Sequence, residues 1–240
     1  MVWLIVILTL RVMTTMIHWI LFDAVGTLIY ADPPVADVYH GIGYSFGSKL
    51  NRDEICLRFP LALAAEHSVT QPTSEAHERE RWRRIVANVI DDVGDATNQV
   101  FEQLWQHFAQ PRHWRLFDDA SPALRELRRR GFRLGIASNF DARLHYIVEG
   151  MPDLAACEAV IVSSEVGYTK PDPRFFTVVQ NQLGATPSQM ALVGDDLVAD
   201  IQGATAAGWR AILLDRSGAL AKPCIRTLAE LSVEQPSRLL

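Results

Sequence analysis

Apolar runs alternate with segments of helical periodicity over the second half of this chain. Four runs after residue 112 have the length and composition of buried strands: R-L-G-I-A-S-N (133–139), A-V-I-V-S (159–163), M-A-L-V-G-D-D (190–196) and R-A-I-L-L-D (210–215). Strands that alternate with helices form parallel sheets with helices on both faces. An earlier apolar run, Ile17–Phe22, predicts one more buried strand. The sequence therefore predicts an α/β fold with a Rossmann-like, doubly wound parallel sheet.

Residues 34–111 show helical spacing of apolar residues and no convincing strand. A chain of 240 residues is long enough for one domain that carries an insertion. We therefore expect a smaller, all-helical cap domain at 34–111, inserted into an α/β core domain made of residues 17–33 and 112–240. In the core, S-P-A-L-R-E-L-R-R-R-G predicts a helix with Ser121 as its N-cap.

Residues 1–16 form an uncertain apolar N-terminal extension. Its apolar stretch is too short to span a bilayer, and it lacks a clear signal-peptide pattern. We favour an over-extended start, with Met13 or Met16 as alternatives. A short extra strand or packing arm comes second, and a membrane anchor third.

Charge and cysteine content limit the partners of the chain. The net charge of −5 does not suggest a nucleic-acid-binding protein, which needs a basic face. The three cysteines are far apart in sequence and have no metal-ligand spacing, which favours a reducing, cytoplasmic location. We expect no stable membrane association. A monomer and a homodimer both stay open.

Polar residues follow the ends of the predicted strands. They are Asp23, Ser138, Asn139, Lys170, Asp195, Asp196 and, one helical turn later, Asp200. Each alone fits a turn or a helix cap. Ligands of open α/β sheets bind beyond the carboxyl ends of the strands, so four strands that deliver such groups to one edge predict a shared site.

The residue types at this edge indicate a chemistry. Carboxylates from two strand ends repel each other unless a cation lies between them. Ligands that are all oxygen atoms, without His or Cys, favour Mg²⁺. A cation, a lysine and a serine hydroxyl together suit a phosphate group. A carboxylate such as Asp23 beside the phosphorus can act as a nucleophile and form an aspartyl-phosphate.

Four motifs then carry a resemblance to a known family. F-D-A-V-G-T-L, I-A-S-N, T-K-P-D-P and V-G-D-D-L-V-A-D-I-Q-G-A occur in this order. From Ile17 onward the chain resembles members of the haloacid dehalogenase-like (HAD) superfamily, with a helical cap inserted between the first and second motifs.

The resemblance implies Mg²⁺ as cofactor, a small phosphorylated metabolite as substrate and a set of roles. Asp23 would be the nucleophile and a metal ligand, together with the backbone carbonyl of Val25, Asp195 and Asp200. Substrate phosphate would contact Gly26, Thr27, Ser138, Asn139 and Lys170, with Thr27, Ser138 and Lys170 also counted as catalytic. Asp196 ranks lower, because the family often has serine in its place.

The first motif departs from the family pattern at Val25. Phosphatases of the family usually carry a second aspartate there, which protonates the leaving oxygen and later activates water. General acid–base catalysis contributes about 10²–10⁴-fold, so a valine predicts a slow or specialised phosphatase. The hydrolysis of acyl and aryl phosphates would be slowed least, because their leaving groups are stable as anions. Candidate substitutes at the cap entrance are Asp32, Asp37, Tyr39 and His40.

Two alternatives remain. The first is a catalytically weak or inactive protein that binds a phosphorylated ligand. The second is a hydrolase of dehalogenase or phosphonatase type. Dehalogenases of the family resemble D-A-Y-G-T but lack the metal site, and phosphonatases use a cap lysine, for which Lys49 is the candidate.

We expect a charged segment and a group of aromatic residues in the cap to serve its structure. E-R-E-R-W-R-R (78–84) predicts a charged helix face with Trp82 turned inward, with a phosphate-attracting patch as the less favoured alternative. Phe101, Trp105 and Phe108 are expected in the core of the cap.

Overall fold

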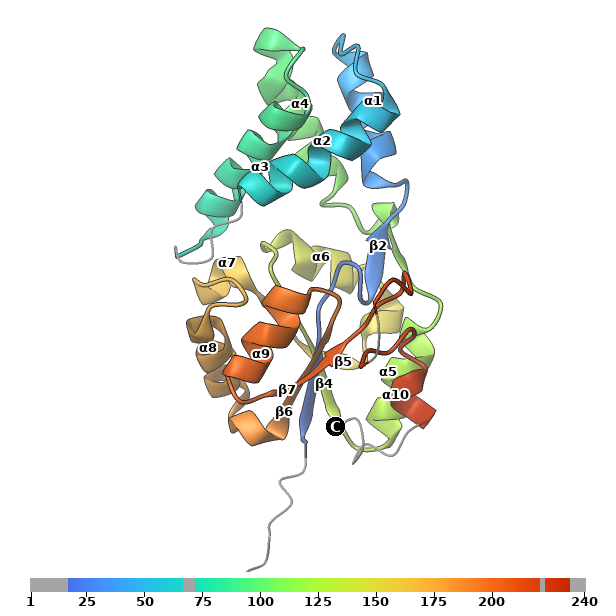
Figure 1. Cartoon of the computed structure of the whole chain (residues 1–240), viewed down its shortest axis with the longest axis vertical. Coiled ribbons are helices and arrows are strands. Elements are labelled where there is room, and N and C mark those ends of the chain that lie inside the picture. Colours follow the sequence, from blue (N-terminus) through green and yellow to red (C-terminus); the bar gives the residue numbers. More distant parts are fainter. Residues whose placement is uncertain (1–16, 67–71, 221–222, 234–240) are drawn as a thin grey trace, which may run out of the picture.

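A computed structural model describes residues 17–66, 72–220 and 223–233. The predicted extension, residues 1–16, lies outside the described residues. The chain forms two stacked parts, with four helices at one end and a sheet covered by helices at the other (Figure 1). No described helix combines the length and the apolar character that a membrane crossing needs.

The larger part is built on a five-stranded parallel sheet. Its strands are β1 (Trp19–Phe22), β4 (Arg133–Ser138), β5 (Cys157–Val162), β6 (Met190–Gly194) and β7 (Arg210–Leu213), in the spatial order β5-β4-β1-β6-β7. The five strand predictions and the fold class are confirmed. The chain runs outward from β1 to β5 and then returns to β6, so the order reverses between β1 and β6. Ligand sites of doubly wound folds lie at such a reversal.

Helices cover both faces of the sheet (Figure 1). One face carries α5 (Ala120–Arg129), α6 (Arg143–Glu149) and α10 (Glu230–Val233); the other carries α7 (Ser163–Val166), α8 (Pro173–Leu183) and α9 (Gly203–Ala206). β1 supplies both cores, because successive side chains of a strand point to opposite faces. Ile20 and Phe22 pack with the first set of helices, while Trp19 and Leu21 pack with the second.

Short helical turns connect these elements. The 3₁₀ turns are η1 (Gly94–Ala96), η2 (Pro111–His113), η3 (Pro152–Leu154) and η4 (Pro187–Gln189), and η5 (Leu197–Gln202) is π-helical. Ser121 does not cap α5, contrary to prediction. The helix already begins at Ala120, and the Ser121 hydroxyl donates instead to Asp153 Oδ1 at 2.6 Å.

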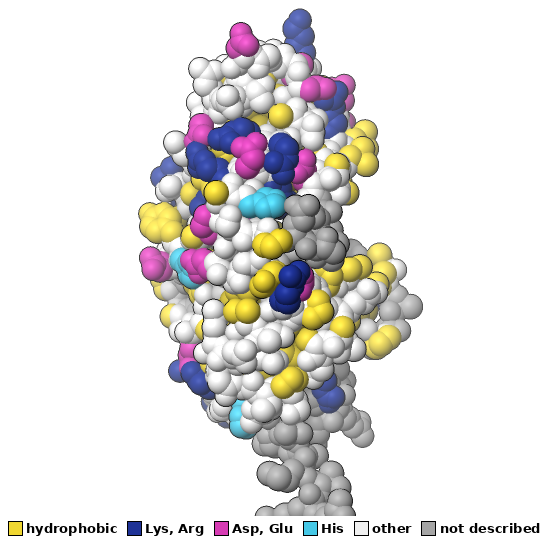
Figure 2. Space-filling model, turned by 90° about the vertical axis from the view of Figure 1, so that its left-hand side faces the viewer, with side chains coloured by type: hydrophobic (Ala, Val, Ile, Leu, Met, Phe, Trp, Pro, Cys, Tyr) yellow, Lys and Arg dark blue, Asp and Glu magenta, His cyan; other side chains and the backbone are white. Residues whose placement is uncertain are grey.

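Four helices form the smaller part, which we call the cap. They are α1 (Val35–Ser45), α2 (Arg52–Ala65), α3 (Glu75–Val89) and α4 (Thr97–His107). Their inner faces share a hydrophobic cluster of their own, which includes Tyr39, Ile55, Ile85 and Phe101. On the face shown in Figure 2, acidic and basic side chains are interspersed over the cap rather than separated into patches of one sign.

A two-stranded antiparallel ribbon joins the cap to the sheet-containing part. It consists of β2 (Ile29–Ala31) and β3 (Trp114–Leu116), which lie where the chain leaves the core and where it returns. The sequence analysis missed both strands, because three residues are too few to show an alternating pattern. The predicted boundaries after residue 33 and before residue 112 fall beside this ribbon.

Candidate active site

Three carboxylates converge at the reversal point of the sheet. Asp23 directly follows β1, Asp195 follows β6, and Asp200 lies in η5. One oxygen of each lies within 4.8 Å of one oxygen of the others. The structure therefore brings together three residues that are up to 177 positions apart, counted from Asp23 to Asp200.

Two glycines permit this convergence. Gly26 has a φ of +88°, which side-chain-bearing residues rarely adopt, and a Cβ there would lie 2.4 Å from Asp195 Oδ2. A Cβ at Gly194 would lie 2.1 Å from Asp200 Oδ2. Gly26 also donates its amide hydrogen to Ile29 O at 2.9 Å, which closes the turn after Asp23. Any side chain at either glycine would displace a carboxylate.

Lys170 provides the positive charge beneath this cluster. Its side chain is 1% exposed, and Nζ donates to Asp23 Oδ1 at 2.8 Å, to Asp200 Oδ1 at 2.5 Å and to the carbonyl of Ala137 at 2.8 Å. Burial alone would lower the pKa of Lys170, but Asp200 and Asp23 outweigh it and raise that pKa above its ordinary value. The residue is therefore a fixed ammonium that holds the nucleophile candidate in place.

The carboxylates carry more negative charge than Lys170 offsets. Removal from bulk water, with the nearby charges of Asp23 and Asp200, raises the pKa of Asp195 to about 6. Burial also raises the pKa of Asp200, although Lys170 acts in the opposite direction. Burial is the main cause of both shifts, and the charge of neighbouring carboxylates adds to it. A divalent cation held by oxygen ligands fits this arrangement.

Ser138 and Asn139, at the end of β4, differ in their contacts. The Ser138 hydroxyl lines the cavity above the carboxylates and makes no hydrogen bond to any described residue. The Asn139 amide instead forms a reciprocal pair with Lys170: its Nδ2 donates to the lysine carbonyl at 2.8 Å, and its Oδ1 accepts from the lysine amide at 2.7 Å. This pairing favours a role in positioning Lys170 over the predicted substrate contact.

Thr27 and Gly26 do not line the cavity. Thr27 is fully buried, and its hydroxyl donates to Asp195 Oδ1 at 3.1 Å. The geometry thus favours an orienting role for Thr27 over the predicted phosphate contact. The sequence could not reveal this contact, because Asp195 lies 168 positions from Thr27.

Arg216 is a further positioning residue, which sequence reasoning missed. Its guanidinium donates to the carbonyl of Thr27 at 2.7 Å and to that of Gly26 at 3.3 Å, and it pairs with both oxygens of Asp119 at 2.9 Å. It therefore ties the turn after Asp23 to the loop before α5. A single arginine after a strand gives no sequence signal for such a contact.

The cavity above the carboxylates has a volume of about 300 Å³, and residues of the cap form part of its wall. Leu63, His77, Glu78 and Arg81 contribute to its walls from α2 and α3. Part of segment 78–84 thus faces the cavity: Glu78 and Arg81 line it, and Glu78 is buried and accepts from Thr73 Oγ1 at 2.7 Å. His77 also lines this cavity, and sequence reasoning missed it because no local pattern shows which cap residues face the core.

Comparison with known proteins identifies the family. The model of haloacid dehalogenase-like hydrolases matches residues 17–208. The chain belongs to this family. It is 30% identical to the human haloacid dehalogenase-like hydrolase domain-containing protein 3 over 82% of both chains. A phosphatase of Mycobacterium tuberculosis is 36% identical over 68% of this chain and 70% of its own. A HAD phosphatase from Thermococcus onnurineus has the same fold, with a TM-score of 0.63, 23% identity and coverage of 90% and 96%.

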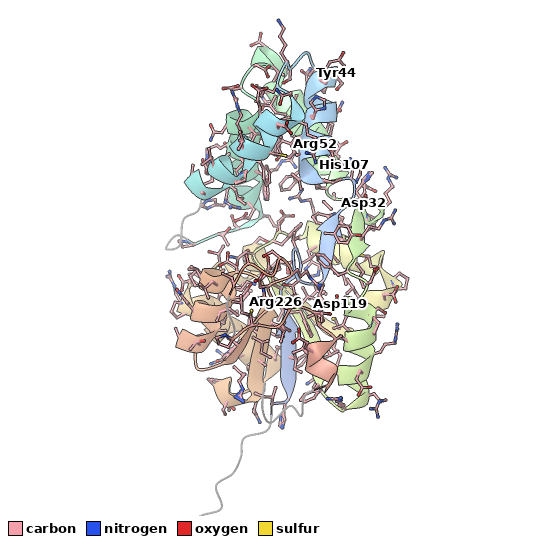
Figure 3. All side chains as sticks on the ribbon, turned by 45° about the vertical axis from the view of Figure 1, so that its right-hand side comes forward. Asp32, Tyr44, Arg52, His107, Asp119 and Arg226 are labelled. Carbon is pink, nitrogen blue, oxygen red and sulfur yellow. The ribbon has the colours of Figure 1, made fainter. Side chains whose placement is uncertain are left out.

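Among the residues proposed to replace the missing acid of this HAD-like hydrolase, two are engaged elsewhere. Asp32, at the junction between cap and core, pairs with Arg115 at 2.9 Å (Figure 3). Asp37 pairs with Arg52. Neither they nor His40 line the active-site cavity, and Tyr39 lies beside Val25 in a second cavity. Asp32, Asp37 and His40 are therefore not placed to replace an aspartate at position 25.

Lys49, the lysine candidate of the phosphonatase alternative, is exposed and lines neither of these cavities. Its backbone amide donates to Asp92 Oδ2 at 2.7 Å. The geometry of this HAD-like hydrolase gives no support to a Schiff base at Lys49.

Proposed function

We propose that this hydrolase is a Mg²⁺-dependent phosphatase that acts on a small organic phosphate through an aspartyl-phosphate on Asp23. One observation carries the proposal: Asp23 lies on the floor of a cavity, hydrogen-bonded to a buried ammonium and beside two further carboxylates. The name of the Mycobacterium tuberculosis relative, a phosphatase, supports it.

In the first step, the Asp23 carboxylate attacks the phosphorus, and the bond from phosphorus to the leaving oxygen breaks. The leaving group takes the electron pair of that bond. Lys170 holds Asp23 in position and offsets part of the charge that gathers around the phosphoryl group. The Ser138 hydroxyl donates a hydrogen bond to a phosphoryl oxygen.

Asp23, Asp195 and Asp200, with the carbonyl of Val25, would hold the Mg²⁺ ion. When bound, the ion would offset the charge of the three carboxylates and of the transferring phosphoryl group. The oxygen-only donor set and the raised pKa values of Asp195 and Asp200 support this assignment.

In the second step, water attacks the phosphorus of the aspartyl-phosphate, which releases phosphate and restores the Asp23 carboxylate. A base in the position of residue 25 would take a proton from this water. Val25 cannot do so, and we therefore expect the second step to be slow.

Phosphate release from aryl, acyl and sugar phosphates, with and without Mg²⁺, tests the proposal, with Asp23→Asn beside the wild type. We expect release that needs Mg²⁺ and that the Asn variant loses. Mg²⁺ binding without release from any substrate would favour the alternative of a phospho-ligand-binding protein. Halide release from a 2-haloacid, independent of metal, would favour the dehalogenase alternative.

A further inference from the structure

A second cavity of about 240 Å³ lies next to the first, between the cap and the core. Most of its wall is aromatic, and we call it the aromatic cavity: Tyr39, Phe59, Trp82, Trp105, Phe108 and Phe140 line it. It shares Val25, Leu63, Asn139 and Phe140 with the cavity above the carboxylates. The two cavities therefore adjoin at these four residues.

The rings of the wall form a connected series. Trp82 is stacked with Phe59, with centroids 6.5 Å apart, and Phe59 meets Tyr39 edge-on at 5.3 Å. Such spacings are those of favourable aromatic pairs. A further aromatic ring placed among them finds both faces and edges to pack against. The sequence analysis expected Phe101, Trp105 and Phe108 in the core of the cap, and all three also line this cavity.

The positive charge in the wall is paired with a carboxylate that lies outside the cavity lining. Arg143 is the one cation among the described residues that line it. Its guanidinium pairs with both oxygens of Asp141 at 2.7 Å and lies 3.4 Å from the centroid of the Trp105 ring. The hydroxyl groups of a sugar would find few partners here, and an unpaired buried polar group is costly. The cavity thus disfavours sugar phosphates.

The size of the cavity fits one ring. A dry apolar cavity of about 150 Å³ is enough to bind benzene. The aromatic cavity, at about 240 Å³, accommodates a ring with a small substituent.

From these observations we infer that the substrates are phosphate monoesters of phenols, with the aryl ring in the aromatic cavity and the phosphoryl group at Asp23. This inference rests on the proposed phosphatase function. Phenols have a pKa of about 10, far more acidic than aliphatic alcohols. When Asp23 attacks, the bond from phosphorus to the aryl oxygen breaks and phenolate leaves with the electron pair, to be protonated by water. Phenolate can leave without the proton that an aspartate at position 25 would donate.

Selectivity is tested with phenyl phosphate, acetyl phosphate and glucose 6-phosphate. Acetyl phosphate lacks a ring but has the better leaving group, so a higher kcat/KM for phenyl phosphate can only reflect binding of the ring. We expect kcat/KM for phenyl phosphate to exceed that for acetyl phosphate by at least about tenfold, because a ring is buried only in the first. Equal values for all three would overturn the inference while leaving the phosphatase function intact.

Substitutions in the wall test whether the preference for phenyl phosphate comes from the aromatic cavity. Trp82→Ala and the milder Phe59→Leu should each lower the ratio of the two kcat/KM values, Trp82→Ala by about tenfold. Tyr44→Ala is the matched control, because Tyr44 is an exposed aromatic of the cap that lies outside the cavity (Figure 3). An unchanged ratio in both folded wall variants would contradict the inference.

Binding measurements test the preference for an aryl group without any need for turnover. Phenylphosphonate and methylphosphonate are titrated calorimetrically into the wild type and Trp82→Ala in the presence of Mg²⁺. We expect phenylphosphonate to bind at least about tenfold more tightly to the wild type and to lose this advantage in the variant. Equal affinities would refute the aryl preference even if no phosphate ester is hydrolysed. A preference for phenylphosphonate without any phosphate release would uphold the ring site and refute the phosphatase function.

Discussion

Nζ of Lys170 lies 2.8 Å from Oδ1 of Asp23, although 147 positions separate the two residues. The parallel sheet creates this contact, because β1 and the segment after β5 end at the same edge. Asn139 fixes the lysine through both atoms of its amide group. Three distant segments thus combine to hold the candidate nucleophile Asp23 against a buried cation.

Val25→Asp should raise the turnover of alkyl phosphates. An aspartate at this position could protonate the leaving oxygen, which is worth about 10²-fold or more for a poor leaving group. Turnover of phenyl phosphate should gain much less in its first step. Steady-state rates for both esters measure the difference. No gain, in a folded variant that binds Mg²⁺, would mean that another group already supplies the proton.

Mg²⁺ should stabilise the wild type against heat, and Asp195→Asn should abolish this effect. At about 100 times Kd, a ligand that binds only the folded state adds about 2.7 kcal/mol, which corresponds to about 5–10 °C in Tm. Asp196→Asn is the control, because that carboxylate accepts from the amides of Val198 and Ala199 and is not part of the three-carboxylate cluster. Equal shifts in both variants would place the ion elsewhere.

Arg216→Gln should lower kcat by at least about tenfold with little change in KM, because it frees the carbonyls of Gly26 and Thr27 and loosens the turn after Asp23. Arg216→Lys should recover part of the loss. Arg226→Gln is the control, since Arg226 pairs with Asp215 and does not contact this turn (Figure 3). If both Gln variants lose stability alike and neither changes kcat, Arg216 has no positioning role.

Asp215→Asn should destabilise the protein at neutral pH but not near pH 2. Hydrogen bonds from Ser217 and Leu220, with the charge of Arg226, lower the pKa of Asp215 to about 2. The unfolded carboxyl has a pKa of about 3.9, so this stabilisation is fully present above that pH and is lost as the pH falls towards 2. Melting temperatures of both proteins across pH 2–7 should converge at the acidic end. A constant difference would show that the charge of Asp215 is not responsible.

Much of the fold could be predicted from the sequence because buried strands are local signals. Ile20 to Phe22 and Met190 to Val193 are apolar runs with a carboxylate shortly after them, and the repetition of polar residues after several such strands indicates a site at the sheet edge. The structure shows why Gly26 and Gly194 are glycines: the backbone at each position lies close to a carboxylate.

Other features depend on partners that no local pattern reveals. Thr27 is a plausible phosphate contact in sequence, but folding turns its hydroxyl towards Asp195. The periodicity of α3 indicates an amphipathic helix, but not that Arg81 would face the active-site cavity. Likewise, aromatic spacing in the cap predicts a core and cannot show that part of it is left as a cavity beside Val25.

Detection of the covalent intermediate tests whether Asp23 is the nucleophile. With an aryl phosphate, formation of the aspartyl-phosphate needs no acid, whereas its hydrolysis lacks the base that Val25 replaces. We therefore predict a rapid release of about one equivalent of phenol per active site before a slower steady state, and labelled phosphate on Asp23 after acid quenching. Phenol release without such a burst, together with label absent from Asp23, would contradict the account.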